Sequence, residues 1–390
     1  MNSLSLDNSI NQNKPSNGSG PYRVMLVDDS SVIRGLLSRW LSADPAIEIV
    51  ASVGNGQVAL NSLERTDPEI VVLDIEMPVM DGLTALPLIL KAKPNVQVLM
   101  SSTLTLKNAQ TSLHAMSLGA ADYIPKPTTN REVITSQSFQ TEIIEKVKSL
   151  ASAKRKLLGR RAFVETKKRT TPTSSTDQII KSNVKAPKTI VKRNASMVAP
   201  KVIGVGSSTG GPQALLKFLI SIKDDLTLPV VITQHMPASF TKILAGHLSK
   251  ATGLDCIEAE EKTPLENGKV YIARGDHHMV VKSDGGKKYL SLNQDPPENF
   301  CRPAVDPMFR SLAEEFGPAV LCVMLTGMGQ DGLKGSKYMV ENGGTIIAQD
   351  QETSVVWGMP GAVSEAGICH DILPLEELGA KVLRLVKGGR

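Results

Sequence analysis

Aromatic residues make up only 4% of the 390-residue chain, which disfavours a nucleic-acid surface of stacked aromatic side chains. No apolar run reaches the roughly eighteen residues of a membrane span, and residues 1–20 lack the apolar core of a secretory signal. The four cysteines are scattered without a C-x-x-C pair, so neither a disulfide framework nor a structural zinc site is indicated. We therefore expect a cytoplasmic protein with no membrane insertion and no nucleic-acid partner.

Positive charge is concentrated in one stretch. Residues 146–201 contain sixteen Lys or Arg and only two acidic residues, a net charge of +14 in a chain of net +5, so the remainder carries −9. The stretch is rich in Ser, Thr and Pro and keeps apolar periodicity only at its start, which is typical of a linker. An anion-binding strip for nucleic acid or lipid headgroups is the alternative, but interleaved aromatic or periodic apolar residues are lacking.

Two α/β domains flank this linker. Apolar strand-like runs alternate with segments of helical spacing, which predicts parallel sheets covered by helices on both faces. A more β-rich middle, residues 255–293, interrupts the alternation of the second domain. The predicted units are a disordered tail (1–20), a (βα)5 domain (21–145), a basic flexible linker (146–200) and a doubly wound, mostly parallel α/β domain (201–390).

Acidic residues follow two predicted strands of the first domain. Asp28 and Asp29 end the first strand and Asp74 ends the third, so three carboxylates converge at the carboxyl edge of the sheet. Such a cluster needs a hard cation, and Mg²⁺ suits its oxygen ligands. Ser101 and Lys126 end the fourth and fifth strands, and the full set favours phosphoryl transfer to Asp74. Helix capping by Asp28 or Asp29 is the simpler alternative for either residue alone.

The motifs of this domain resemble those of the receiver domain of two-component response regulators. The resemblance implies phosphorylation at Asp74, Mg²⁺ held by Asp28, Asp29, Asp74 and the backbone carbonyl of Glu76, and a phosphate-sensing switch formed by Ser101 and Tyr123 with Lys126. The motifs are Val27-Asp28-Asp29-Ser30, Leu73-Asp74-Ile75-Glu76-Met77-Pro78, Met80-Asp81-Gly82 and Lys126-Pro127.

A G-x-S-x-G pattern opens the second domain. Residues 206–210 lie between a predicted strand and a predicted helix, and this spacing is typical of a turn that presents a nucleophilic serine beside backbone N–H groups. The central serine is Ser208. A dinucleotide-binding loop is the rival, but Thr209 stands where its third glycine belongs and the next strand lacks the ribose-binding acid.

A serine nucleophile needs a base and an orienting anion. His235 and Asp331 each follow a predicted strand, as Ser208 does, so all three could meet at one sheet edge. His277 and His278 also follow a strand, and periodicity alone does not choose among the histidines. Capping of the next helix is the simpler alternative for Asp331.

The two domains together resemble the chemotaxis response regulator protein-glutamate methylesterase/protein-glutamine deamidase family. The resemblance implies Ser208 as nucleophile, His235 as general base and Asp331 as its orienting residue, with Thr209 and Met328 beside the nucleophile or oxyanion site. The motifs are residues 206–211, Ile232-Thr233-Gln234-His235-Met236-Pro237, Arg302-Pro303-Ala304-Val305-Asp306 and residues 325–332.

The implied function is hydrolysis of glutamate methyl esters, with release of methanol, and deamidation of glutamines. Methyl-accepting chemotaxis receptors are the implied substrates, the pathway's histidine kinase is the phosphodonor, and the hydrolysis itself needs no metal. The unphosphorylated receiver is implied to cover the catalytic rim. Two rivals are a C-terminal domain that only binds a partner and a DNA-binding regulator, although no helix-turn-helix pattern follows residue 201.

Overall fold

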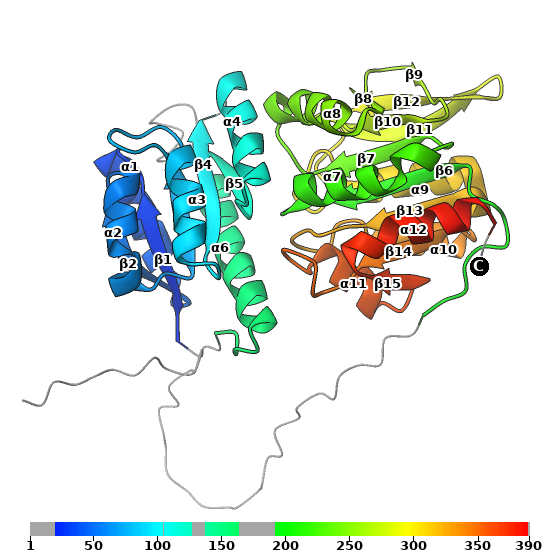
Figure 1. The fold of residues 1–390 in the computed structure, drawn as a ribbon. Helices are drawn as coiled ribbons and strands as arrows, with labels where there is room; N and C mark the ends of the chain where they lie inside the picture. The colour runs from blue at the N-terminus through cyan, green and yellow to red at the C-terminus, as the bar shows by residue number, and fades with distance from the viewer. Residues whose placement is uncertain (1–19, 104, 127–136, 164–191, 389–390) are drawn as a thin grey trace, which may run out of the picture.

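The computed structural model describes residues 20–103, 105–126, 137–163 and 192–388, which form two α/β domains (Figure 1). The predicted tail, apart from residue 20, and residues 164–191 of the predicted linker lie outside the described residues. No helix among the described residues is long and apolar enough to cross a membrane.

The N-terminal domain is a five-stranded parallel sheet of order β2-β1-β3-β4-β5. Helices α1 and α6 cover one face and α2, α3 and α4 the other, as predicted for alternating strands and helices. The strands are β1 (Tyr22–Val27), β2 (Ile47–Val53), β3 (Ile70–Asp74), β4 (Gln97–Thr103) and β5 (Asp122–Lys126). The helices are α1 (Ser31–Ser42), α2 (Gly56–Thr66), α3 (Gly82–Ala92), α4 (Leu106–Ser117) and α6 (Gln137–Leu157).

The C-terminal domain is built on a seven-stranded parallel sheet of order β15-β14-β13-β6-β7-β10-β8. The strands are β6 (Val202–Ser207), β7 (Val230–Gln234), β8 (Asp255–Glu258), β10 (Lys269–Ile272), β13 (Val320–Met324), β14 (Thr345–Gln349) and β15 (Asp371–Leu373). The strand order runs in opposite directions on the two sides of β6, toward β13 on one side and toward β7 on the other. Doubly wound sheets usually bind ligands at the carboxyl ends of the strands at such a switch point, here at the end of β6.

Helices cover both faces of this sheet. The β-rich middle supplies β8 and β10 to it and forms a small antiparallel sheet of order β11-β12-β9. The helices are α7 (Gly211–Ile222), α8 (Ala238–Thr252), α9 (Val305–Phe316), α10 (Leu333–Glu341), α11 (Met359–Glu365) and α12 (Leu375–Val386). The antiparallel strands are β9 (Thr263–Pro264), β11 (His278–Asp284) and β12 (Lys287–Asn293). The fold class predicted from the sequence is thus confirmed.

The predicted start of the linker at residue 146 is wrong, because α6 continues to Leu157. Arg155 explains the continuation: its guanidinium is buried, pairs with both carboxylate oxygens of Glu69 at 2.6 Å, and donates to the carbonyls of Gly20 and Pro21. The end of the predicted linker also packs on the C-terminal domain, where Arg193 N–H donates to the Cys369 carbonyl.

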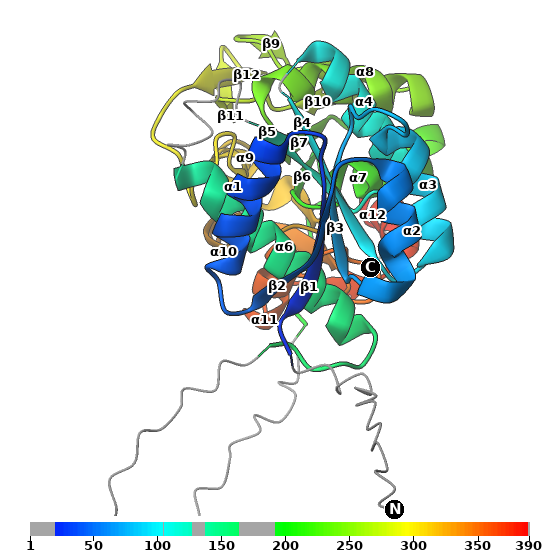
Figure 2. The same ribbon diagram turned by 90° about the vertical axis from the view of Figure 1, so that its left-hand side faces the viewer.

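The two domains lie against each other, and the N-terminal domain presents α4, β5 and α6 to its neighbour (Figures 1 and 2). Helix α4 contacts α7 and α8. Buried side chains from one face of each sheet join in a single apolar cluster. Part of the domain interface therefore lies on the two helices that follow β6 and β7.

Candidate active site and receiver site

Ser208 lies in the sharp turn between β6 and α7. Gly210 has φ +74°, a left-handed conformation, and an added Cβ would lie 2.6 Å from Val355. Gly327 approaches from the loop after β13, where an added Cβ would lie 3.0 Å from the Ser208 Cβ. These glycines allow the turn and the close approach, which leaves Ser208 partly exposed above the sheet.

Gln234 joins this turn to the end of β7. Its carboxamide accepts from Ser207 Oγ at 2.7 Å and donates to the carbonyls of Ser208 at 2.9 Å and His235 at 3.1 Å. The side chain is buried, and its bond with Ser207 is fully shielded from water. The backbones of Ser208 and His235 are therefore fixed to each other by one amide.

His235 and Asp331 form a hydrogen-bonded pair. The Nε2 atom of His235 lies 2.7 Å from Asp331 Oδ2, and their side chains are 13% and 2% exposed. Asp331 also accepts from the backbone N–H of Val305 at 2.6 Å and of Gly332 at 2.9 Å. The cap of α10 is Gly332, so the capping alternative for Asp331 is wrong.

The charges of this pair stabilise each other. Burial alone would raise the pKa of Asp331, but its bond to His235 and the backbone N–H groups of Val305 and Asp306 hold that pKa below its usual range. Burial would lower the pKa of His235, but Cys301 and Asp331 outweigh it and raise that pKa to about 10. The imidazolium is therefore favoured in this arrangement.

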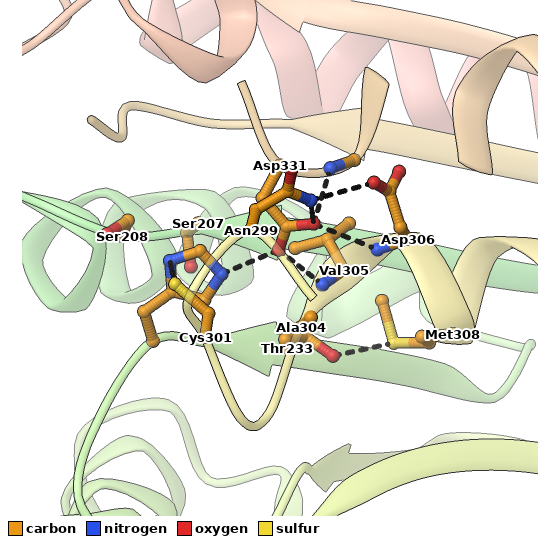
Figure 3. A network of polar contacts seen from close by, with 12 residues as sticks. Ser207, Ser208, Thr233, Asn299, Cys301, Ala304, Val305, Asp306, Met308 and Asp331 are labelled. Carbon is orange, nitrogen blue, oxygen red and sulfur yellow. Dashed lines mark hydrogen bonds and ion pairs between the residues drawn. The ribbon is translucent and has the colours of Figure 1, made fainter. Parts of the chain in front are cut away.

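Cys301 faces the other nitrogen of the same ring. Its Sγ lies 3.5 Å from His235 Nδ1, opposite the nitrogen that contacts Asp331. Figure 3 shows Ser207 and Ser208 on the same side of the polar network as Cys301, away from Asp306 and Met308. Among the described residues it is therefore the thiol, and not the Ser208 hydroxyl, that makes the contact with Nδ1.

Thr209 and Met328 lie near the turn, where the resemblance places them. Thr209 is buried and its hydroxyl has no hydrogen-bond partner among the described residues. Met328 follows Gly327, the residue that approaches Ser208, and is partly exposed. A buried hydroxyl without a partner beside a nucleophile is a donor that a bound substrate could use.

The other candidate histidines have structural partners. His278 is buried, its Nε2 lies 3.1 Å from the Pro296 carbonyl, and its Nδ1 accepts from Ala304 N–H. His277 Nδ1 lies 3.3 Å from the Gly275 carbonyl. Of the three histidines that follow strands, His235 is the one paired with Asp331.

The three carboxylates of the N-terminal domain converge as predicted. Asp28, Asp29 and Asp74 place ligand oxygens within 4.8 Å of one another. Lys126 Nζ lies 2.6 Å from Asp28 Oδ2 and 2.8 Å from Asp74 Oδ1. Ser30 caps α1, so neither Asp28 nor Asp29 has the capping role that the alternative required.

This oxygen-rich cluster fits a hard divalent cation. Burial is the main cause that raises the pKa of Asp74 to about 6, while Lys126 opposes the shift and Asp28 adds to it. Asp29 and Glu76, which follow β1 and β3, are exposed and so lie open to solvent at the same edge. Additional positive charge would favour the ionised form of Asp74.

Ser101 and Tyr123 lie on adjacent strands beside this cluster. Ser101 is paired with Asp74 in the sheet register, is buried, and its hydroxyl has no hydrogen-bond partner among the described residues. Tyr123 points to the other domain, where its ring stacks on Phe240 of α8 with centroids 4.5 Å apart. The Ser101 hydroxyl is thus available for a new hydrogen-bond partner. The Tyr123 ring belongs to the domain interface.

Contacts from the N-terminal domain reach the two helices that follow Ser208 and His235. Phe240 lies in α8, which begins three residues after His235. Gln213 in α7 donates to the carbonyls of Met116 and Ala120, the latter at 2.9 Å. Each of the two helices that follow a candidate catalytic residue thus contacts the N-terminal domain.

A third contact reaches the loop beside Ser208. Val356 belongs to the apolar cluster formed by α1, β1 and α6, and Met328 and Val355 pack against that cluster. Val356 also bonds to the loop after β13, where its carbonyl accepts from Gly327 N–H at 3.0 Å. The N-terminal domain therefore packs against the rim of the candidate site.

Comparison with known proteins identifies a family for each of the two domains. A family model described as the response regulator receiver domain matches residues 24–137, and one described as CheB methylesterase matches residues 203–382. A protein-glutamate methylesterase/protein-glutamine glutaminase from Rhodospirillum rubrum is 52% identical over 94% of this chain and 95% of the relative. The chain belongs to this methylesterase family.

Other members of the methylesterase family are similarly close. The Azospirillum brasilense protein of the same name is 52% identical over 93% of this chain and 92% of its own length. The crystal structure of the Thermotoga maritima CheB methylesterase catalytic domain is 41% identical, with a TM-score of 0.47, over 48% of this chain and all of that chain. The N-terminal domain is thus a receiver domain and the C-terminal domain a CheB catalytic domain.

Sequence reasoning missed three residues of the catalytic domain that support the pair. Gln234 fixes the two backbones, Cys301 contacts the imidazole, and Asn299 donates to Asp331 Oδ1 at 2.8 Å. Gln234 directly precedes His235, and Cys301 directly precedes the motif that begins at Arg302. This closeness in sequence was the only feature that could have indicated their roles. None of these contacts follows from strand or helix periodicity.

Proposed function

We propose that this chain is a phosphorylation-activated hydrolase that demethylates glutamate methyl esters and deamidates glutamines on methyl-accepting chemotaxis receptors. The printed names of its relatives support the two reactions. The receiver domain supports control by a histidine kinase, which would act as phosphodonor in the cytoplasm. The observation that carries the proposal is the His235–Asp331 pair at the edge where the Ser208 turn ends.

In the proposed reaction, Ser208 Oγ attacks the γ-carbonyl carbon while His235 Nδ1 accepts the hydroxyl proton. The protonated imidazole, held through Nε2 by Asp331, then gives that proton to the leaving methoxide, and methanol departs. Water attacks the acyl-serine with the same base, which releases the glutamate carboxylate and restores Ser208. With glutamine as substrate, ammonia leaves instead, and the chemistry requires no metal.

Hydrogen-bond donors near the turn would stabilise the tetrahedral intermediate. Thr209 offers its unpartnered buried hydroxyl, and the glycine loop that carries Met328 lies against Ser208. The amino end of α7 adds its partial positive charge beside Ser208. A donor of this kind lowers the barrier by about 3 kcal/mol.

In the receiver domain, Asp74 is the proposed phosphoryl acceptor. Asp28, Asp29, Asp74 and the backbone carbonyl of Glu76 would hold Mg²⁺, which neutralises charge on the transferred phosphoryl oxygens. Lys126 already contacts Asp28 and Asp74 and would pair with the phosphoryl group.

Ser101 and Tyr123 form the proposed switch. A phosphoryl group on Asp74 would supply the partner that the Ser101 hydroxyl lacks. Tyr123 would follow Ser101 and leave the Phe240 ring, which weakens the domain interface. The catalytic rim is then opened to the receptor.

Cys301 is a second candidate nucleophile, because its sulfur is the group that lies at His235 Nδ1. We favour Ser208 because it stands in a strand–turn–helix, whereas Cys301 closes a two-residue hairpin loop. A serine-directed fluorophosphonate, followed by mass spectrometry of the labelled peptide, distinguishes the two.

Labelling at Ser208 that is lost in Ser208→Ala would support the serine mechanism. Modification of Cys301 in place of Ser208 would transfer the nucleophile to the thiol. Absence of labelling at both residues, with receptor binding retained, would favour the alternative in which the catalytic domain only binds a partner.

A further inference from the structure

A tight turn at Glu298–Asn299–Phe300–Cys301 lies beside His235. Glu298 and Cys301 exchange backbone hydrogen bonds of 3.1 and 2.9 Å, which closes a two-residue hairpin loop. Asn299 and Phe300 have φ values of +50° and +63°. Asparagine tolerates this region, but the second position of such a loop is usually glycine, and a side chain there is strained.

The turn is anchored on the catalytic pair. The Asn299 amide donates to Asp331 Oδ1 at 2.8 Å and to Asp306 Oδ2 at 2.9 Å. Cys301 Sγ lies 3.5 Å from His235 Nδ1. Glu298 pairs with Arg310, which fixes the other end of the hairpin. The backbone of Phe300 is therefore held next to the imidazole by its two chain neighbours.

The Phe300 side chain is fully exposed, with a relative accessibility of 102%. Every other phenylalanine among the described residues is buried or partly buried. The nearby charges have partners, since Arg302 pairs with Asp276 and Arg310 with Glu298. What the turn offers to an approaching molecule is thus an uncovered apolar ring, even with the receiver domain docked.

We propose that Phe300 is a docking residue that binds an apolar side chain of the receptor segment carrying the methyl ester. This inference rests on the proposed function. A glutamate side chain spans only about four bonds from its backbone, so the segment must pass over the rim formed by Ser208, His235 and Cys301. On a helical segment, residues three or four positions from the ester share its face and lie where the Phe300 ring can cover them.

Because the turn is strained, the proposal predicts opposite effects of one substitution on stability and on receptor binding. Replacing Phe300 with glycine removes the ring and relieves the left-handed strain, so Tm should stay the same or rise. The same change should raise KM for methylated receptors about tenfold, because apolar contact in the bound state is lost. Turnover at saturation should change little, because the ring does not touch the reacting atoms.

The experiment measures methanol release by the full-length chain, with phosphodonor and Mg²⁺, on methylated receptor membranes and on N-acetyl-glutamate γ-methyl ester methylamide. Phe300→Gly and Phe300→Ala are compared with Phe300→Trp, which should keep the receptor KM. Met197→Ala is the matched control, since Met197 is an exposed apolar residue outside the site. The small ester should show the same KM in every variant.

A receptor-specific rise in KM with an unchanged KM for the small ester would support docking by Phe300. An unchanged receptor KM in Phe300→Gly, with an active wild-type chain, would overturn the inference and leave the proposed function intact. An equal loss on both substrates would also overturn it, because the turn would then act on His235 alone. Absence of methanol release by the wild-type chain would overturn both proposals.

Discussion

At His235, two groups stabilise the positive charge of one ring. Asp331 holds Nε2, and Cys301 lies at Nδ1, where a general base must accept the proton of Ser208. Together they raise the pKa of His235 to about 10 against the opposing effect of burial. A general base works in its neutral form, so this environment favours catalysis at alkaline pH.

The first prediction concerns Cys301→Ala. Without the sulfur, the pKa of His235 should fall, and each unit of that fall raises the neutral fraction at pH 7 about tenfold. The rising acidic limb of kcat/KM should therefore move to lower pH relative to the wild-type chain. Methanol release measured from pH 6 to 10 tests this shift.

An unchanged pH profile in Cys301→Ala would show that the thiol does not control the imidazole. Complete loss of activity would instead identify Cys301 as the nucleophile. Cys322→Ala is the matched cysteine control, because Cys322 is buried in β13 and away from the ring.

The second prediction concerns Asp74→Asn. This variant should keep basal methanol release but lose stimulation by a small-molecule phosphodonor, because the amide cannot accept the phosphoryl group. Removal of divalent cations with EDTA should have the same effect on the wild-type chain, since the phosphoryl oxygens would lack their counter-charge. Methanol release with and without acetyl phosphate measures both.

Full stimulation of Asp74→Asn would contradict the gating scheme at its first step. Loss of basal release in EDTA would contradict the metal-free hydrolysis proposed for Ser208.

Among the elements, α7 and α8 connect the two domains. Each begins beside a proposed catalytic residue, and each contacts the receiver domain, through Gln213 and Phe240 respectively. A stacked aromatic pair and neutral hydrogen bonds each contribute about 1 kcal/mol. Each of these two contacts is therefore modest, and the proposed switch would act on them first.

The third prediction follows from Gln213. Replacing it with alanine removes the bonds to the Met116 and Ala120 carbonyls, so basal methanol release without phosphodonor should rise about two- to tenfold. Release at saturating phosphodonor should stay near the wild-type level, because the interface is already open.

Lys217→Ala is the control for this prediction. Lys217 lies in the same helix but is exposed and faces Glu376 of α12. Equal basal release in the wild type and Gln213→Ala would indicate that this contact does not restrain the enzyme.

The helices and strands could be predicted from the sequence where buried apolar strands lead directly into polar residues. Asp74 ends an apolar strand and Asp28, Ser208 and His235 directly follow one, and within each sheet the parallel strands bring these ends to one edge. Prediction from the sequence failed in α6, where Lys154, Arg155 and Lys156 suggested a solvated linker. Arg155 is instead buried against Glu69, a partner 86 positions away that no local pattern indicates.

The residues that contact the His235–Asp331 pair could not be predicted from the sequence either. Asn299, Cys301 and Gln234 act through side-chain contacts between separate loops and strands. Their roles depend on how strand ends and turns are placed in three dimensions. Sequence periodicity carries no information about that placement.

At the scale of the whole molecule, the receiver domain packs on the rim that a receptor would approach under the proposed function. Val356, Met328 and Val355 join its apolar cluster, while Phe300 stays exposed on the same rim. A docking residue left uncovered would let a receptor bind before the rim opens. Activation would then change the rate of hydrolysis more than receptor affinity.

The most direct test is methanol release from methyl-labelled receptor membranes by the wild-type chain and Ser208→Ala, with and without phosphodonor and Mg²⁺. The account predicts release that rises with phosphodonor and falls at least about 1000-fold in the variant, which should still be phosphorylated at Asp74. Release that persists in Ser208→Ala, or that phosphodonor leaves unchanged in the wild type, would contradict it.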